Sequence, residues 1–501
     1  MPKKYIAEIA KDIDLIGDIE FHKQAQDEEG IVSTFIIKAP TGYGKSHYIM
    51  NDFYNHCQKR GYKVLFLLPR SAPTKQFIKQ TKNKKDVITV KTYQAITHDY
   101  ITNSKCDLDY DFIICDECHY FVTDSLINTG TDICFDLISR SRAFTIYISA
   151  TPEPLLEIVY STYEINIASE NTVIKEINFF ETYSDKTTKE TIIDIMENVS
   201  EKAIIFCNSA GMAKEIYSMK KFTDNSLFIC SEYNEKYSSL MNQEGRNKLI
   251  ETGRFDCKYL ICTSALDVGF SIEDEEVKDI ICTFSPQNWT NLIQSIGRKR
   301  QVNPQDKATL HIRNFTANQI DNALDVNQRR FEHLKYYREY GELEYLKKYR
   351  KRYDENNIIV TDYRLLDDGS IQTFIKEDKF VFGYYKYQEK ILREIKKARS
   401  YAEYLKEKLQ IADDVTIHHK KKDDYIDSRL KEIAAEGITY DSNTLNELTT
   451  KLNIRSSKRE LLKRPSVINK RLQEMGKPYM IETTEDEQRH KHYKFIFIGQ
   501  A

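Results

Sequence analysis

A short segment near the start of the chain combines two glycines, a lysine and a serine in a pattern suited to phosphate binding. It reads Ala39-Pro-Thr-Gly-Tyr-Gly-Lys-Ser46 and lies between an apolar run and a helical stretch. A tight turn of this kind points backbone N–H groups inward, and the N-terminus of the following helix adds partial positive charge. Lys45 would then reach the β- and γ-phosphates of a nucleotide, and the Ser46 hydroxyl would coordinate Mg²⁺. The residues expected to hold the phosphates are Thr41, Gly42, Gly44, Lys45 and Ser46.

Two adjacent carboxylates follow the apolar run Phe112–Cys115. Asp116 is expected to hold Mg²⁺ directly or through water, and Glu117 to polarise the attacking water as general base. The alternative is a solvated Asp-Glu turn, against which the fully apolar run argues. The same stretch also matches the C-x-x-C-H pattern of haem attachment. We reject haem and zinc, because an export signal is lacking and phosphate chemistry already accounts for this strand.

Short apolar runs that alternate with helical stretches must position these residues. Continuous apolar runs are typical of strands buried on both faces of a parallel sheet. Four strands are expected in a first domain, residues 1–170: Thr34–Lys38, Val64–Leu68, Phe112–Cys115 and Phe144–Ser149. Five more are expected in a second domain, residues 171–316: Ala203–Cys207, Ser226–Cys230, Tyr259–Cys262, Asp279–Cys282 and Leu310–Arg313. The stretch 161–200 is expected to be a linker and first crossover.

The pattern changes after residue 316. Residues 317–410 predict a helical accessory region that contains a hairpin. Its expected elements are a long helix Glu332–Tyr353, strands Ile358–Thr361 and Ser370–Phe374, and a helix over 384–409. Residues 411–501 predict three short helices and a two-stranded ribbon, which is the order of a winged helix-turn-helix. Those elements are Ile426–Glu436, Ser442–Leu452 with Ser442 as N-cap, Ser466–Met475, Tyr479–Ile481 and Tyr493–Ile498.

The turn after the second of these helices and the third helix carry concentrated positive charge. Residues 451–477 contain nine basic residues against two acidic ones. A recognition helix in the DNA major groove, with flanking basic residues on phosphates, would use this charge. The residues expected to contact nucleic acid here are Lys458, Lys463, Arg464, Lys470 and Arg471, with Asn469 or Arg471 as base readers. The alternative is a solvated basic face that packs on the preceding domains.

The composition of the chain excludes several classes of protein. Lys and Arg number 74 against 76 Asp and Glu, which excludes a uniformly basic nucleic-acid coat. The chain is 41% hydrophobic and 30% charged, as globular proteins are. No apolar run is long enough to cross a bilayer, and the amino end lacks the apolar region of a signal peptide. The ten cysteines lie mostly within apolar runs, which is typical of buried thiols in a reducing cytoplasm. We expect a cytoplasmic protein with no membrane partner.

Taken in order, the motifs over residues 30–315 resemble those of the superfamily 2 helicases and translocases. Ala39–Ser46 resembles motif I, and Asp116-Glu117-Cys118-His119 the DExH form of motif II. The other resemblances are Pro69-Arg70 with Gln76 and Thr92-Tyr93-Gln94 (motif Ia and the segment after it), Ser149–Pro152 (III), Phe206–Ser209 (IV), Thr263–Gly269 (V) and Gln294–Arg300 (VI).

The resemblance implies two RecA-like domains with ATP and Mg²⁺ in the cleft between them. It implies that Arg298 and Arg300 act as arginine fingers beside Gln294 of motif VI. Ser149 and Thr151 would couple the phosphate state to domain closure. Gly269 of motif V would contact the nucleotide. The nucleic-acid contacts implied on the motor are Arg70, Thr92 and Thr263.

Motif VI departs from the usual G-R-x-x-R spacing. The second arginine is Arg300, and position 301 is Gln301. This shortened form is similar to that of herpesvirus-type origin-binding helicases and of phage or mobile-element helicases. Gln24 and Gln26 lie upstream of the phosphate loop without the flanking pattern of an adenine-reading Q-motif.

Together these features predict an ATP-dependent DNA helicase or translocase that acts in phage or mobile-element replication or recombination. Its partners would be single-stranded, duplex or forked DNA and a replication or nuclease protein. Three alternatives stay open. The first is an RNA-remodelling ATPase of the same superfamily. The second is a DNA-binding scaffold that uses ATP as a switch. The third is the motor subunit of a nuclease or defence complex.

Overall fold

The structure is a computed structural model, in which the chain divides into two compact units. One comprises Met1–Ile177 with Thr182–Ile417, and the other Asn178–Glu181 with His418–Ala501. Arg70, Gly269 and Lys458 lie outside the described residues. The described residues are 13–30, 34–69, 71–128, 130–160, 162–167, 173–182, 184–232, 234–263, 271–349, 358–365, 370–398, 400–411, 415–420, 430–431, 433–452, 454, 462–474, 477–486 and 490–498.

The first sheet has the order β3-β2-β4-β5-β1-β6, and all its strand pairs are parallel. The four predicted strands are confirmed and form its centre. The strands are β1 (Thr34–Lys38), β2 (Val64–Leu68), β3 (Ile88–Thr92), β4 (Phe112–Asp116), β5 (Phe144–Ser149) and β6 (Thr162–Asn166). The two strands that the sequence did not predict, β3 and β6, are the edges. They are only partly buried, so their sequences lack the continuous apolar run of the central strands.

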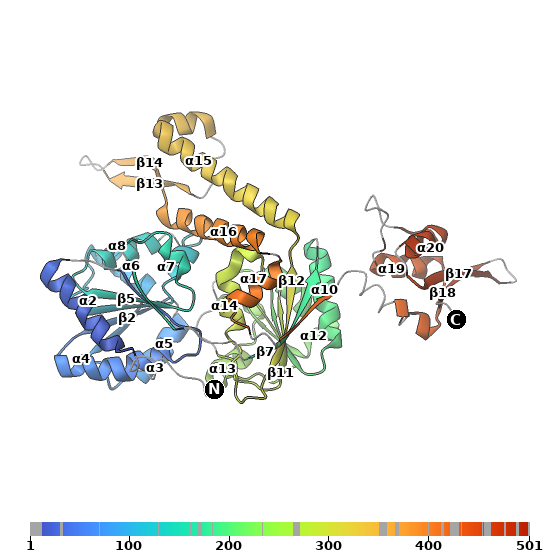
Figure 1. Cartoon of the computed structure of the whole chain (residues 1–501), viewed down its shortest axis with the longest axis horizontal. Helices are drawn as coiled ribbons and strands as arrows, with labels where there is room; N and C mark the ends of the chain where they lie inside the picture. The colour runs from blue at the N-terminus through green and yellow to red at the C-terminus, as the bar shows by residue number, and fades with distance from the viewer. Residues whose placement is uncertain are drawn as a thin grey trace. The chain divides into compact units, whose positions relative to one another are not determined.

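Helices cover both faces of this sheet (Figure 1). Alternate strand residues feed two apolar clusters: Phe35 and Ile37 lie in one, and Ile36 lies in the other. The helices are α2 (Leu15–Glu29), α3 (Lys45–Tyr48), α4 (Tyr54–Arg60), α5 (Ser71–Gln80), α6 (Tyr93–Asn103), α7 (Tyr120–Thr123), α8 (Thr131–Ser139) and α9 (Glu153–Leu156), with a π-helical turn η1 (Ile49–Phe53) between α3 and α4.

The second sheet has the order β15-β7-β12-β11-β8-β10-β9, and the five predicted strands are confirmed within it. The strands are β7 (Ile174–Glu181), β8 (Lys202–Phe206), β9 (Ser226–Ile229), β10 (Tyr259–Cys262), β11 (Val277–Cys282), β12 (Ala308–Asn314) and β15 (Thr416–Lys420). Its helical segments are α10 (Asp185–Asn198), α11 (Ala210–Tyr217), α12 (Lys220–Thr223), η2 (Ser238–Leu240), α13 (Gln243–Thr252), η4 (Pro286–Asn288) and α14 (Trp289–Ile296). The linker expected over 161–200 is wrong in part, since that stretch supplies β6, β7 and α10.

The accessory region consists of α15 (Ala317–Tyr349), the hairpin β13 (Ile359–Leu365) and β14 (Ile371–Glu377), α16 (Lys379–Lys397) and α17 (Tyr401–Lys408). The predicted hairpin is confirmed as an antiparallel pair. Gly341 leaves the helical conformation (φ 78°, ψ −179°) and breaks α15. The helix expected over 384–409 is two helices, because the backbone becomes extended at Ala398 and Ser400 caps α17. Phe380 of α16 packs on Phe135 of α8, which covers the first sheet, and the two ring centroids are 5.3 Å apart.

The carboxy-terminal unit has its own apolar core. Its described elements are α19 (Ser442–Leu452), α20 (Pro465–Glu474) and a sheet β16-β18-β17, whose strands are Thr439–Tyr440, Lys491–Phe497 and Tyr479–Glu485. Residues 433–436 are also helical. Ile468, Leu472 and Phe495 are fully buried in the core. Asp441, rather than Ser442, caps α19, since its carboxylate accepts from the Thr444 N–H at 2.8 Å.

All ten cysteines are free thiols, and none is exposed. Among the described residues, no helix is long and apolar enough to span a membrane.

Candidate functional site

The phosphate loop joins β1 to α3. Gly42 (φ 79°) and Gly44 (φ 76°) both take the left-handed conformation, which a side chain disfavours. Lys45 is the first residue of α3, and its Nζ donates to the carbonyl oxygens of Ala39 (2.9 Å) and Pro40 (3.3 Å). Burial lowers the pKa of Lys45, although the nearby carboxylates of Glu117 and Asp116 oppose this effect. Ser46 follows within the first turn of α3.

The paired carboxylates lie where β4 ends. Asp116 is 8% exposed, and the phenol of Tyr93 donates to its carbonyl oxygen at 2.7 Å. Burial, and then the charge of Glu117, raise the pKa of Asp116. Glu117 has φ +50°, a conformation that costs energy for a residue with a side chain. The backbone therefore turns sharply at this residue.

Glu117 is the centre of a polar network on the first sheet. Its Oε2 accepts from Ser149 Oγ at 3.3 Å, and His119 Nδ1 lies 3.6 Å from the same oxygen. Ser149 Oγ also lies 2.9 Å from His119 Nδ1 and accepts from the Thr151 N–H at 3.0 Å. Burial alone would raise the pKa of Glu117, but Lys45, His119 and Arg298 together lower it. The carboxylate is thus held in its ionised form.

A glutamine connects this network to the second sheet. Gln294 of α14 is 1% exposed, and its Nε2 donates to Glu117 Oε2 at 3.3 Å and to Thr151 Oγ1 at 3.2 Å. Its Oε1 accepts from Arg298 Nη2 at 3.4 Å. One buried amide therefore contacts the candidate base, the coupling threonine and a candidate arginine finger.

The second arginine lies on the phosphate loop itself. A Cβ atom at Gly42 would stand 2.5 Å from Arg300 Nη1. Arg300 donates from Nη1 to the Gly297 carbonyl (2.6 Å) and from Nε to Ser271 Oγ (3.2 Å). Thr41 Oγ1 donates to the same carbonyl at 3.2 Å. Burial, reinforced by Arg298, lowers the pKa of Arg300 to about 10. The glycine at position 42 leaves the space that the guanidinium occupies.

The structure thus brings together residues from both sheets that lie far apart in the sequence. They are Thr41, Gly42, Lys45, Asp116, Glu117, Ser149, Thr151, Gln294, Arg298 and Arg300. Their arrangement can bind a nucleotide phosphate, orient a water against it and place positive charge opposite.

Two nucleic-acid candidates of the first unit follow strands. Thr92 ends β3, and its Oγ1 accepts from the Ala95 N–H at 3.1 Å, so this oxygen caps α6. Thr263 follows β10, and its N–H donates to the Ile229 carbonyl at 3.3 Å.

In the carboxy-terminal unit, Lys463, Arg464 and Lys470 are exposed on and before α20. Arg471 is half-buried, and its Nη1 lies 3.2 Å from Glu474 Oε2. Asn469 was expected as a possible base reader, and the geometry opposes this. Its Nδ2 donates to the Ile481 carbonyl (2.9 Å) and its Oδ1 accepts from the Ile481 N–H (2.7 Å). The amide joins α20 to β17.

Sequence reasoning did not assign roles to two further residues of the quoted motifs. His119, the last residue of the DExH segment, contacts Ser149 and Glu117. Gln94 Nε2 donates to the Pro69 carbonyl (3.0 Å) and to Tyr120 Oη (2.9 Å), and so joins the second strand's end to α7. Gln26, considered for adenine reading, donates instead to the carbonyls of Arg142 and Ala143 at 3.2 and 3.4 Å.

Two family models match the chain. The model described as type III restriction enzyme, res subunit, matches residues 74–154, and the helicase conserved C-terminal domain matches residues 187–301. Among curated proteins, the genome polyprotein of hepatitis C virus genotype 1c (isolate HC-G9) is 30% identical over 141 residues, which is 26% of this chain and only 4% of the polyprotein.

Similar solved structures include Dbp5 of S. cerevisiae bound to RNA and ADP BeF3, with a TM-score of 0.44 at 13% identity, covering 62% of this chain and 86% of Dbp5. The E. coli DEAH/RHA helicase HrpB has a TM-score of 0.42 at 13% identity, covering 62% of this chain and 43% of HrpB. These TM-scores are below 0.5, so the assignment rests on the two family models, which fall on the two parallel sheets. The two family models support a superfamily 2 helicase, that is, a nucleic-acid-dependent nucleoside triphosphatase, and neither model spans half of the chain.

Proposed function

We propose that the protein is an Mg²⁺-dependent ATPase that uses hydrolysis to move on or unwind DNA. The observation that carries the proposal is the buried path from Glu117 through Gln294 to Arg298, with Thr151 attached to it. This path joins the candidate general base of one sheet to a candidate arginine finger of the other. A change in the phosphate bound beside Glu117 can therefore shift Arg298 of the other domain through direct hydrogen bonds.

The chain's own residues divide the hydrolytic step between them. The N–H groups of the loop and Lys45 bind the phosphates, and ionised Glu117 orients a water and accepts its proton. Arg298 and Arg300 stabilise the charge that develops on the phosphoryl oxygens. Ser149 holds Glu117 and His119 in place, so it fixes where the base lies.

The donor set fits a magnesium ion. The hydroxyl of Ser46 and the carboxylate of Asp116 are oxygen ligands, which Mg²⁺ prefers. Asp116 is buried beside another carboxylate, an environment in which a divalent cation offsets the repulsion. When bound, the ion would supply positive charge to the phosphate oxygens. Gly269 is proposed, from motif V, to contact the nucleotide.

DNA is proposed as the nucleic acid because of the carboxy-terminal unit. Its helices α19 and α20 and the sheet β16-β18-β17 support a winged-helix arrangement, in which we propose α20 as the recognition helix. Exposed Lys463, Arg464 and Lys470 suit phosphate contacts. Arg70, Thr92, Thr263, Lys458 and Arg471 are proposed as further contacts. A role in replication or recombination of a phage or mobile element, with a replication or nuclease partner, remains part of the proposal.

The decisive experiment is steady-state ATP hydrolysis without nucleic acid and with single-stranded, duplex and forked DNA and matched RNA. We expect strong stimulation by DNA that is lost in Glu117→Gln, because the amide cannot accept a proton from water. Stimulation by RNA alone would reassign the protein to RNA remodelling. No stimulation by either polymer would leave an ATP-dependent switch or a motor that needs a partner.

A further inference from the structure

The shortened spacing of the two arginines has a structural basis in the backbone. Helix α14 ends at Ile296, and Lys299 forms a parallel β-bridge with Ile272. The Ile272 N–H donates to the Arg298 carbonyl (2.8 Å), and the Arg300 N–H donates to the Ile272 carbonyl (2.9 Å). Alternate residues of an extended segment point to opposite sides. At the bridge, Lys299 points to Asp306, whereas the side chains of Arg298 and Arg300 reach Gln294 and Gly42 of the candidate site.

Lys299 is held on that opposite side by a buried ion pair. Its Nζ lies 2.5 Å from Asp306 Oδ2, and both side chains are 0% exposed. The same ammonium donates to the Arg300 carbonyl at 2.9 Å. Asp306 Oδ2 also accepts from the Val302 N–H at 2.9 Å. The pair thus fastens the backbone at Arg300 and closes the turn that follows it.

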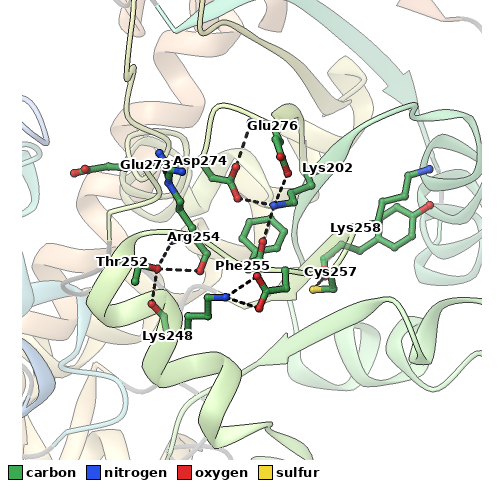
Figure 2. A network of polar contacts seen from close by, with 12 residues as sticks. Lys202, Lys248, Thr252, Arg254, Phe255, Cys257, Lys258, Glu273, Asp274 and Glu276 are labelled. Carbon is green, nitrogen blue, oxygen red and sulfur yellow. Dashed lines mark hydrogen bonds and ion pairs between the residues drawn. The ribbon is translucent and has the colours of Figure 1, made fainter.

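The segment that pairs with Lys299 is anchored by a second lysine. Lys202 Nζ lies 3.0 Å from Asp274 Oδ2 and 2.7 Å from Glu276 Oε2, and it donates to the Phe255 carbonyl at 2.6 Å (Figure 2). The Glu273 N–H donates to the Gly253 carbonyl at 2.8 Å. One residue after Ile272 the chain is therefore tied to the end of α13, and two residues after it to β8. This anchor fixes the strand against which the arginine segment is aligned.

A buried ion pair is costly, and apolar residues of similar volume often stabilise a fold as well or better. Stability alone therefore does not account for the Lys299–Asp306 pair. The pair also makes two hydrogen bonds to the backbone, at Arg300 and Val302. We propose that Lys299 and Asp306 are positioning residues that hold the 298–300 segment in its bridge to Ile272, so that Arg298 and Arg300 both face the phosphate site. The proposal rests on the ATPase function proposed above.

The first test compares Lys299→Met and Asp306→Asn with the full-length wild type in steady-state ATP hydrolysis. Loss of an arginine finger costs 10³–10⁵ in kcat, so misplacing both arginines should lower kcat about 100-fold or more. The KM for ATP should change less than about threefold, since the phosphate loop is intact. Lys248→Met is the matched control. Lys248 pairs with Asp256 at 2.6 Å in the same domain, but its side chain is 47% exposed, and we expect an unchanged kcat.

A second pair of variants separates positioning from folding. Lys299→Met/Asp306→Leu removes both charges, so its thermal midpoint should recover towards wild type while its kcat stays low, because the Arg300 carbonyl and the Val302 N–H lose their partners. Recovery of both quantities would overturn the proposal. In an Arg300→Ala background, Lys299→Met should lower kcat by a much smaller factor than it does in the wild type. An equal further loss would show that the lysine acts by another route.

The outcomes distinguish the two proposals. If the wild type hydrolyses ATP and the folded Lys299 and Asp306 variants hydrolyse it equally well, the positioning role is wrong and the ATPase assignment stands. If the wild type shows no hydrolysis with any nucleic acid, the proposed function itself fails.

Discussion

The phosphate site and the basic helix of the carboxy-terminal unit hold their polar side chains in opposite ways. Gln294, Thr151 and Arg298 are at most 5% exposed, and each has a hydrogen-bond partner within the site. Lys463, Arg464 and Lys470 are exposed. A buried polar group loses much when one partner is removed, whereas an exposed charge acts through water and salt. The first region should therefore respond sharply to single substitutions, and the second gradually to the sum of its charges.

This contrast also limits what each region can specify. A network of fixed distances can detect the presence or absence of one phosphate. A set of exposed charges measures the density of phosphates along a polymer, which is sequence-independent. Asn469 of α20 is engaged on both of its polar side-chain atoms, and it serves packing against β17 rather than recognition.

The largest expected effect is that of Lys45→Ala. Hydrolysis should fall by about 10³-fold or more, because the ammonium that binds the phosphates is lost. Nucleic-acid affinity at fixed salt should change less than about twofold. Parallel measurements of turnover and of binding to labelled DNA check this. A comparable loss in both would mean that the two regions are not separable.

Gln294→Ala should have the next largest effect. The variant removes three hydrogen bonds, two of which join the two domains, and we expect kcat to fall about 100-fold with nucleic acid present, a size typical of a lost preorganised donor. Stimulation by nucleic acid should fall with it, while ATP-analogue binding should persist. If basal and stimulated rates fell by the same factor, Gln294 would support catalysis without coupling the sheets.

Replacing Lys463, Arg464, Lys470 and Arg471 together by alanine tests the gradual response. DNA affinity should weaken roughly tenfold or more at low salt, and the slope of log affinity against log salt should fall by about 3–4 if each contacts one phosphate. Basal hydrolysis should not change. A matched control neutralises four basic residues that are exposed on α4 and α12, Lys59, Arg60, Lys220 and Lys221. An unaltered salt slope in the test variant would remove α20 from the interface.

The smallest expected effect is a shift in pH dependence. Burial and Glu117 raise the pKa of Asp116, whereas the pKa of Glu117 is lowered. As pH falls, Asp116 is therefore protonated first and can no longer hold Mg²⁺. Activity should be present above the raised pKa of Asp116 and decline as pH falls through it. Since metal and proton compete, a tenfold increase in Mg²⁺ should move this acid limb down by up to about one pH unit. If the acid limb does not move with the Mg²⁺ concentration, it reports the titration of another group.

The four central strands of the first sheet and five strands of the second could be predicted from the sequence, because burial on two faces requires a continuous apolar run, but the interior strand β7 was missed. The edge strands β3 and β6 could not, since partial exposure leaves a mixed sequence. The break in α15 at Gly341 was missed for a related reason: the flanking residues favour a helix, and only tertiary packing decides where it turns.

The residue types and order of the phosphate site also followed from the sequence, because phosphate chemistry needs a glycine loop, a lysine and paired acids at strand ends. The spacing of Arg298 and Arg300 by itself looked like a defect in motif VI. The structure explains it by the bridge between Lys299 and Ile272, which lies between the two arginines. No local pattern around Lys299 or Asp306 indicated that they form a fully buried pair.

The sequence alone thus predicted a superfamily 2 helicase, the strands with continuous apolar runs and the candidate phosphate-binding residues, because each depends on local composition and spacing. Only the tertiary structure decided that Gln294 reaches both Glu117 and Thr151, that Arg300 lies on Gly42, and that Asn469 is engaged in packing. These contacts join residues more than ten positions apart, and up to 258, so no local pattern encodes them. They exist because of how the two parallel-sheet domains, and separately α20 and β17 of the carboxy-terminal unit, pack.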